Sequence, residues 1–528
     1  MYPSAMAVDD SGNVFVAGGF YSTVDFGGGL LASAGFDDIF LAKFDSDGDH
    51  LWSHCFGDER EQQYVMDIAL DYDGNVIITG YFNYGEIDFG GGPLGYGAFY
   101  AKFDADGNHL RSESYSNGAA ASIAVDQSNN FIITGEFSSS IDFGGEVLTS
   151  VDIYDIFIVK FDPNGNHIWS YRHGGSQWPS RKSISIDVAE NLILSGYFSN
   201  NIDFGCGPLT TPALDDYIFI AKMDSAVNCL WSDGYETSLS MPEDVFLTID
   251  NSGSAIITGQ FIGTLNFGGT PLISAGSWDF YVAKFDTGGN HQWSNSFGST
   301  EFHDRSHAIT TDKSDNIIIT GNFENKIDFG GDELTGAGYM NVFLAKFTHD
   351  GNHLWSKSYG DSLGSTGRCV AAADAKNIFT AGFFEDNINL GGDTFWNFGD
   401  CDMYIAKLDS IGNHIWSKRF GNWISWEGVG IDDSHLKRNL EFRVYPNPFN
   451  PHTTISFTVP IPTHTILKVY DVKGKLVRTL LNERKIPGKY RLMWDGSDAN
   501  HLPVASGIYF VRLEIDGFST TKKIVHIK

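Results

Sequence analysis

The sequence has 528 residues, of which 42% are hydrophobic, and a formal net charge of −31. This is enough apolar content for a buried core, and the chain is too long for one ordinary domain. The acidic excess disfavours binding to nucleic acid or anionic membrane, because phosphate contacts need clustered Lys and Arg.

The N-terminus leads directly from Met1-Tyr2-Pro3-Ser4 into an apolar segment. It lacks the basic region and the apolar stretch of a secretory signal peptide. No run of 18 or more apolar residues follows anywhere in the sequence, so we expect no transmembrane segment. The sequence leaves open whether residues originally preceded Met1.

A phrase of the type Asp-Phe-Gly-Gly returns seven times, with Asn as its first residue in two copies. A fixed period indicates a copied supersecondary unit whose apolar faces are buried against neighbouring copies. The intervals are 63, 54, 61, 63, 62 and 61 residues. The copies begin at Asp25, Asp88, Asp142, Asp203, Asn266, Asp328 and Asn389.

Each copy contains four short apolar segments bounded by Gly, Asn and Asp, which predict strands. In the second copy they span 68–71, 76–82, 99–104 and 110–115. Turns such as Asp73-Gly74-Asn75 supply the positive φ that short hairpins need. Four antiparallel strands per copy and seven copies predict an all-β fold, a seven-bladed β-propeller over residues 1–421.

The phrases GNVIITGYF (Gly74–Phe82), DIFLAKFD (Asp38–Asp45) and DGNHLWSKSYG (Asp350–Gly360) carry a family resemblance. They resemble the SBBP-type beta-propeller repeat of secreted bacterial proteins. The resemblance implies an extracellular propeller and no single defined reaction.

Three residue types recur once per copy, and a residue repeated around a ring cannot be a unique catalyst. The recurring His do not suggest a zinc site, because equivalent places on separate sheets are about 10 Å apart and zinc ligands lie about 2 Å from one ion. We expect the Lys stems to pack on aromatic surface near Asp, and the Trp rings to fill the gaps between blades. The His are His50, His109, His167, His291, His353 and His414, with Cys229 in the remaining slot. The Lys are Lys43, Lys102, Lys160, Lys222, Lys284, Lys346 and Lys407, and the Trp are Trp52, Trp169, Trp231, Trp293, Trp355 and Trp416, with Arg111 in the second copy.

Long, variable segments join the second strand to the third and one blade to the next, and both sets emerge on one face of the predicted disc. We expect that face to hold any binding site, since recognition concentrates on loops of a rigid scaffold. Its aromatic residues suit stacking on sugar rings or gripping a peptide, or they pack their own loops. The candidates are Trp178, Trp278, Trp396, Trp423, Trp426, Tyr96 and Tyr154.

The acidity has two interpretations: Asp residues that build the repeated turns, or calcium on carboxylate-rich loops. A local group, His303-Asp304-x-x-His307, resembles a metal site but lacks a third convincing ligand, and Asp304 is expected to cap the loop backbone. No nucleophile elbow, HExxH, P-loop or dinucleotide fingerprint is present. Paired loop-face carboxylates for glycoside chemistry stay open. We predict no catalytic residue, metal or other cofactor from these motifs.

Five cysteines form no C-x-x-C motif and lie in different repeat contexts. Their odd number leaves at least one thiol free or paired between chains, so a disulfide framework is not expected. Cys369 and Cys401 belong to the same copy and are the pair to test. The others are Cys55, Cys206 and Cys229.

Charge marks a second domain. Residues 434–528 contain 15 Lys and Arg against 7 Asp and Glu, a net charge of +8, which leaves −39 for residues 1–433. We expect a linker at 422–439, where Val429–Asp432 repeats the first-strand pattern, and a domain at 440–528. About seven short strands there predict an immunoglobulin-like sandwich.

The C-terminal domain resembles the sorting domain of type IX secretion cargo and the related domain of flagellar hook-capping proteins. The resemblance rests on a YPNP start, a VYDxxGK turn and an SGxYF strand followed by a Lys-rich one. It implies export to the extracellular space or outer-membrane surface through the secretion machinery, and removal of the domain in some cases. Alternatively, each matching residue only builds a strand or turn. The matching positions are Tyr445, Pro446, Asn447, Pro448, Gly474, Gly507, Tyr509, Lys522 and Lys523.

The sequence therefore predicts an exported propeller that binds a glycan, a protein or an ion through its variable loops. Two alternatives are a polysaccharide lyase or hydrolase that uses loop-face carboxylates, and a purely structural surface spacer. An enzyme requires titratable groups that converge from several blades, whereas a binder requires aromatic side chains and satisfied polar groups.

Overall fold

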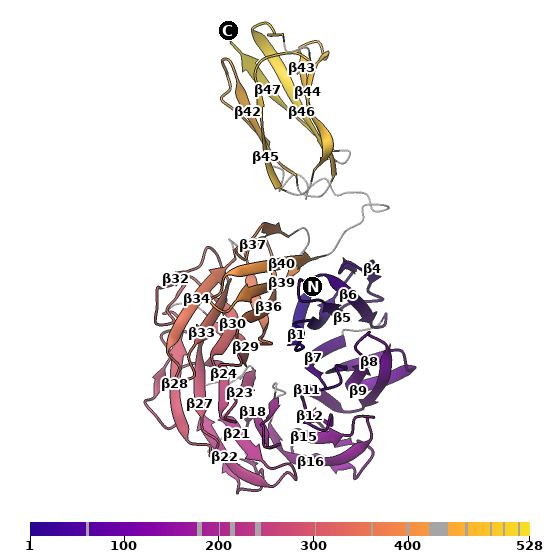
Figure 1. Cartoon of the computed structure of the whole chain (residues 1–528), viewed down its shortest axis with the longest axis vertical. Coiled ribbons are helices and arrows are strands. Elements are labelled where there is room, and N and C mark those ends of the chain that lie inside the picture. Colours follow the sequence, from indigo (N-terminus) through magenta and orange to yellow (C-terminus); the bar gives the residue numbers. More distant parts are fainter. Residues whose placement is uncertain are drawn as a thin grey trace. The chain divides into compact units, whose positions relative to one another are not determined.

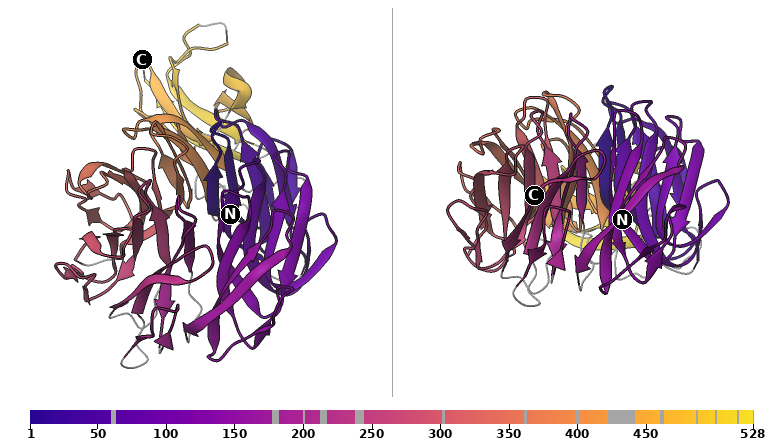
Figure 2. Two further views of the ribbon diagram at one scale, coloured as in Figure 1. Left: turned by 60° about the horizontal axis from the view of Figure 1, so that its bottom comes forward. Right: turned by 90° about the horizontal axis from the view of Figure 1, so that it is seen from below.

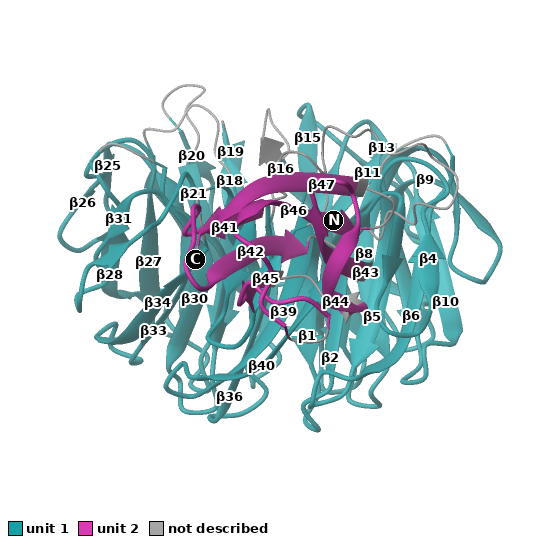
Figure 3. Cartoon of the chain, turned by 90° about the horizontal axis from the view of Figure 1, so that it is seen from above, with its two compact units in different colours: residues 1–423 teal, residues 424–528 magenta. Residues whose placement is uncertain are grey.

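The computed structural model describes residues 1–59, 63–176, 182–199, 201–211, 217–237, 244–300, 303–360, 363–397, 401–421, 442–459, 463–485, 488–499, 502–515 and 518–527. These residues form strands and turns and no helix, so the predicted all-β class is confirmed (Figure 1). Across these same ranges there is accordingly no membrane-spanning helix. The chain divides into two compact units, residues 1–423 and 424–528 (Figure 3).

Unit 1 contains seven four-stranded antiparallel sheets within the described ranges. The four strands of each sheet follow one another in the chain, apart from short hairpin strands between the second and the third. The first strands are β1 (Tyr2–Val8), β7 (Gln63–Leu70), β11 (Gly118–Val125), β17 (Ser183–Ile186), β23 (Val245–Ile249), β29 (Arg305–Thr311) and β35 (Ser365–Ala371). The second strands are β2 (Val14–Phe20), β8 (Val76–Asp88), β12 (Phe131–Phe137), β18 (Leu192–Phe198), β24 (Ala255–Phe261), β30 (Ile317–Phe323) and β36 (Asn377–Phe384).

The third strands are β5 (Asp38–Phe44), β9 (Pro93–Phe103), β15 (Tyr154–Phe161), β21 (Tyr217–Met223), β27 (Asp279–Phe285), β33 (Asn341–Phe347) and β39 (Asp402–Asp409). The outermost strands are β6 (His50–Phe56), β10 (His109–Tyr115), β16 (His167–Ser176), β22 (Cys229–Glu236), β28 (His291–Phe297), β34 (His353–Tyr359) and β40 (His414–Phe420). The sheets are arranged radially around a centre lined by first strands (Figure 1). Viewed from below, their strands run between two opposite faces (Figure 2).

The ring closes, because the first strands of the first and last sheets, β1 and β35, are in contact. The last sheet also bonds the first in the way that other sheets bond their neighbours. Lys407 Nζ and Trp416 Nε1 both donate to the carbonyl of Ser46, at 2.9 and 3.0 Å. Lys43 and Trp52 donate in the same way to Ala105, one sheet further on. The recurring Trp therefore joins neighbouring sheets, as the sequence predicts.

The recurring Lys is held at its ammonium group by a carboxylate of its own sheet. Lys102 and Asp71 lie 2.8 Å apart, and both side chains are almost fully buried. That Asp also accepts the N–H groups of Asp73 and Asn75, which closes the turn between the first two strands. The same ion pair recurs in the next four sheets. Many of the acidic residues are thus parts of turns.

The Asp-Phe-Gly-Gly phrase forms the tip of a hairpin that the sequence did not predict. Its first residue accepts backbone N–H groups of the tip, as Asp25 does from Gly27 at 2.7 Å. Asn266 and Asn389 do the same through Oδ1, which explains why Asp and Asn interchange. In the second sheet the hairpin extends β8 and β9. The others are β3 (Thr23–Asp25) with β4 (Leu30–Ala32), β13 (Ser140–Ile141) with β14 (Leu148–Thr149), β19 (Asn201–Ile202) with β20 (Leu209–Thr210), β25 (Thr264–Leu265) with β26 (Leu272–Ile273), β31 (Lys326–Ile327) with β32 (Leu334–Thr335), and β37 (Asn387–Asn389) with β38 (Thr394–Trp396).

Each of these hairpins folds back onto the outermost strand of its own sheet, where the recurring His meets the second Gly of the phrase. A Cβ at Gly91 would lie 2.6 Å from Cε1 of His109, so only glycine leaves room for the ring. The imidazole Nε2 bonds Ser112 Oγ three residues on, at 2.9 Å. Burial lowers the pKa of this His. The recurring His is thus a packing residue, and its glycine partner could not be predicted from the sequence alone.

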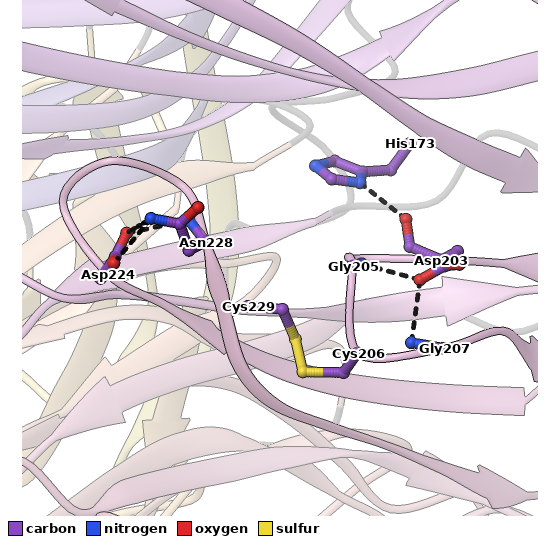
Figure 4. Close-up of a disulfide and its surroundings, with 8 residues drawn as sticks. All are labelled: His173, Asp203, Gly205, Cys206, Gly207, Asp224, Asn228 and Cys229. Atoms are coloured by element: carbon purple, nitrogen blue, oxygen red, sulfur yellow. Dashed lines mark hydrogen bonds between the residues drawn. A yellow bond between two sulfur atoms is a disulfide. The ribbon is translucent and has the colours of Figure 1, made fainter.

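One sheet departs from this arrangement, and there the cysteine expectation is wrong. Cys206 replaces the second Gly and Cys229 replaces the His, and the two form a disulfide (Figure 4). The sequence alone does not relate the two positions, because it does not show that the hairpin folds back onto the outermost strand. Ser232, three residues after Cys229, keeps a buried Oγ with no hydrogen-bond partner. Cys55, Cys369 and Cys401 form no disulfide, so the pair Cys369–Cys401 is not bonded.

Unit 2 is a two-sheet sandwich, which agrees with the predicted immunoglobulin-like domain. One sheet has the order β41 (Phe442–Tyr445), β42 (Thr453–Val459), β45 (Gly488–Trp494). The other has the order β44 (Leu476–Lys485), β43 (Thr463–Asp471), β46 (Gly507–Ile515), β47 (Phe518–His526). Alternate residues point into a shared core around Trp494. The linker repeat Val429–Asp432 lies outside the described residues.

Candidate ligand-binding face

The face of unit 1 on which second strands end and third strands begin is called the loop face here. Antiparallel order places both the second-to-third connections and the sheet-to-sheet connections on it. The opposite face carries only the short turns, whose Asp residues are occupied by backbone N–H groups. Variation between the copies is therefore concentrated on the loop face.

In four of the seven sheets, a residue at the start of the third strand fixes the connection on the loop face. Asp38, Asp155 and Asp279 accept a backbone N–H four residues earlier, at 2.7–2.9 Å. Asn341 replaces Asp in this role, at 3.1 Å. We call these residues the loop caps. They hold the backbone, so the side chains just before them are available for other contacts.

The aromatic candidates Tyr96, Tyr154 and Trp278 all lie one residue before a loop-cap position, as predicted. The side chain of Tyr96 is 49% exposed, while those of Tyr154 and Trp278 are half-buried. The ring centroid of Trp278 lies 5.9 Å from the guanidinium of Arg305. Its carbonyl accepts the N–H of Asp304, which ties this loop to the next sheet.

Trp396 lies elsewhere, at the end of β38, and its carbonyl accepts a 2.6 Å bond from Arg419. The structure thus does not bring it together with the other aromatic candidates at one position. Trp178, Trp423 and Trp426 lie outside the described residues.

Sequence reasoning missed a second set of loop-face residues, placed two positions before the loop caps. Phe36, Ile153 and Tyr339 are 66%, 60% and 64% exposed. Together with Tyr96 they give four different sheets an exposed, large apolar side chain at nearly one position. We call these four residues the loop-face rim. Phe36, Ile153 and Tyr339 each lie seven residues before the recurring Lys, and this shared spacing could have found them.

A group of acids lies beside Trp278. Burial raises the pKa of the loop cap Asp279 to about 6 and also raises the pKa of Asp304 and Glu324. Asp304 is fully buried and accepts the N–H groups of Ser299 and Glu324, so it caps the backbone as expected. Within the described ranges no group of three or more His, Cys, Asp or Glu is arranged to hold a metal ion.

The centre of the ring contains a cavity of about 180 Å³ among the first strands. Asp67, His307 and Arg368 reach its lining from three sheets. Asp67 accepts hydrogen bonds from Ser122 Oγ and the N–H of Ile123, and His307 bonds the Asn322 side chain. The volume is smaller than the 300–1,000 Å³ of typical ligand pockets. Asp67 and His307 therefore have hydrogen-bond partners within the scaffold, around a space smaller than a usual ligand pocket.

Four of the sorting-motif residues of unit 2 have structural roles within the domain. Asn447 bonds the last strand through both side-chain atoms, to the carbonyl of Lys523 and the N–H of Val525, each at 2.9 Å. Tyr509 packs on Trp494 and donates to Ala505. Gly474 has a positive φ of 77° in a tight turn. Pro446 accepts a bond from Thr453 through its carbonyl.

Tyr445, Lys522 and Lys523 are exposed on the outer strands β41 and β47, where another molecule could contact them directly. The motif residues Pro446, Asn447, Pro448 and Gly474 are exposed as well. Pro448 follows β41, and Gly507 begins β46.

A model of the secretion system C-terminal sorting domain matches residues 443–528. Unit 2 is therefore a sorting domain of type IX secretion, and the chain is exported to the cell surface or secreted. An uncharacterized WD repeat-containing protein of Acanthamoeba polyphaga mimivirus is 26% identical over 276 residues, which cover 47% of this chain and 17% of that protein. The match thus spans only a small part of that relative.

Solved structures are similar at low sequence identity. The Dos1 propeller aligns with a TM-score of 0.38 and 10% identity, over 75% of this chain and 93% of its own. A PL25 ulvan lyase aligns with a TM-score of 0.29 and 10% identity, over 92% of each chain. PorZ, a surface component of the type IX secretion system of Porphyromonas gingivalis, aligns with a TM-score of 0.16 and 11% identity, over 100% of this chain and 98% of its own.

Proposed function

We propose that this exported protein is a binding protein whose propeller engages a ligand through its loop face, while unit 2 interacts with the secretion machinery. One observation carries the proposal: the recurring residues have partners within the scaffold, whereas exposed aromatic side chains gather on the loop face. Aromatic residues on a rigid scaffold are the usual anchors of recognition. The SBBP-type character of the repeats stays a prediction.

The test compares the full chain with a variant in which Tyr96, Tyr154, Trp278 and Trp396 are changed to Ala. Both are applied to a glycan array and to a phage-displayed library of random twelve-residue peptides. We expect the chain to select ligands that the variant binds at least about tenfold more weakly. Equal binding by both proteins, or selection of nothing, would contradict the proposal.

A matched control removes apolar side chains from the opposite face. Tyr72, Val188 and Ile411 lie in turns of that face and are 71%, 69% and 64% exposed. A triple Ser variant at these positions should bind like the unchanged chain. Any glycan that binds is then incubated with the chain, and the products are analysed. Bond cleavage would point instead to the lyase or hydrolase alternative.

A further inference from the structure

The loop-face rim is unusual because nothing in the scaffold requires its residues. Phe36, Ile153 and Tyr339 precede loop caps whose side-chain oxygens already fix the backbone. Tyr96 precedes Gly97, which holds the same place in the second sheet and has no side chain. Between 49% and 66% of each side chain is exposed. Exposed apolar groups collected on one face are a mark of interaction surfaces.

A second row of exposed apolar residues shows what scaffold residues look like. Leu51, Leu110, Leu230 and Leu354 follow the recurring slot on the outermost strands and are 47–51% exposed. This position holds a large aliphatic residue in six of the seven copies, with Ile168 and Ile415 in two more of them and Gln292 in the fifth, as expected of a repeat position. The rim instead combines the aromatic Phe36, Tyr96 and Tyr339 with the aliphatic Ile153, as expected where a surface is adapted to a partner.

The chemistry of the rim favours a protein over a carbohydrate. Sugar rings stack on flat aromatic faces, but the rim includes the aliphatic Ile153, beside which Val151 is 76% exposed. Mixed aromatic and aliphatic anchors are typical of protein interfaces. The four rim residues also belong to four sheets, so only a macromolecule can contact several of them at once.

Charge indicates the sign of the partner. Glu59, Asp152 and Glu385 are exposed in the loop-face connections, and Asp37 is partly exposed. Residues 1–433 carry a net charge of −39 in total. Such a surface attracts a cationic partner and repels an anionic one. Resting on the proposed function, and naming the ligand class for its face, we propose that the loop-face rim docks a protein surface that combines basic and large apolar side chains.

The test uses the full chain and the quadruple variant F36S, Y96S, I153S and Y339S, with the same random peptide library as probe. We expect the chain to enrich peptides with a net positive charge and at least two large apolar residues. Synthetic copies of these peptides should bind the quadruple variant at least about tenfold more weakly and lose affinity in high salt. Thermal melts confirm that the variant is folded.

The matched control is L51S, L110S, L230S and L354S, which removes the same number of exposed apolar side chains from the outermost strands and should leave binding unchanged. Enrichment of neutral or acidic peptides, equal affinity for both quadruple variants, or no enrichment at all would overturn the proposal. If the peptides fail while the glycan array gives ligands that depend on the loop face, the proposed function stands and only the protein partner is wrong. If both probes fail, both are wrong.

Discussion

The recurring His and the Ser three residues later form a hydrogen-bonded pair. Its contribution to the free energy of unfolding can be measured by comparing two sheets of the same molecule. In the fifth sheet His291 bonds Ser294 Oγ at 3.1 Å. In the fourth sheet Ser232 holds the same position beside a disulfide, and its buried Oγ has no partner. A buried hydroxyl without a hydrogen bond costs free energy, whereas a paired one stabilises the fold.

We therefore predict opposite outcomes for two identical substitutions. S294A should lower the free energy of unfolding by about 1 kcal/mol, because the imidazole loses its acceptor or donor. S232A should leave it unchanged or raise it. Urea titrations of both variants measure the difference, and equal losses would contradict the assignment.

The loop cap Asp279 is almost fully buried, and its Oδ1 has no partner. Burial raises its pKa from the ordinary 3.8 to about 6. Because the folded-state pKa is the higher one, the ionised carboxylate destabilises the fold above pH 6, and this cost disappears as the pH falls below about 4. Asn341 shows that an amide can perform the same capping.

Replacing this carboxylate by an amide should therefore stabilise the protein in a pH-dependent way. D279N should raise the free energy of unfolding by up to about 2 kcal/mol at pH 7.5, with no gain at pH 4. Denaturant titrations at both values check this. D155N is the control, because Arg172 already neutralises Asp155 at 2.6 Å, so the same change there should not stabilise.

At the scale of the element, the contact between the hairpin tip and the outermost strand, called the joint here, can be formed by either of two residue pairs. Six copies close it with Gly against His, and one closes it with a disulfide. The double variant G269C/H291C should therefore form a second disulfide on air oxidation, visible by mass spectrometry as the loss of two hydrogen atoms. G269C alone should destabilise the protein, because its Cβ would lie 2.6 Å from the His291 ring.

The single variant G269C is the matched control for this joint, since it adds one thiol without a partner on the outermost strand. Only mixed or free thiols are expected from it. Absence of a disulfide from the oxidised G269C/H291C protein would contradict the interchange.

These elements show which structural features could be predicted from the sequence and which could not. The strands around Gly74 and Asp106 were predictable, because apolar alternation and Asp-Gly turns are local signals. The contact between Gly91 and His109 was not, since it depends on a hairpin folding back over the sheet. The same limitation hid the Cys206–Cys229 bond. The exposure of Phe36 was also not predictable, since it depends on the backbone of its connection, which Asp38 fixes by accepting the N–H of Ala34.

At the scale of the whole molecule, the two units have separable tasks. Export depends on residues 443–528, which match the sorting domain. Deletion of this segment should retain the propeller inside cells that secrete the full chain, without changing the binding of purified unit 1 to any selected peptide. Immunoblots of cell and culture fractions check the first part, and secretion of the shortened chain would contradict it.

The last sheet bonds the first through the Ser46 carbonyl, as Lys and Trp side chains do at three other junctions. Among the described residues no strand is shared between the two ends, since each four-stranded sheet contains the strands of one copy. The seam is therefore chemically equivalent to those junctions. Circular permutants that open the chain between any two copies, and link residue 421 to residue 1, should keep the same architecture and melt at similar temperatures.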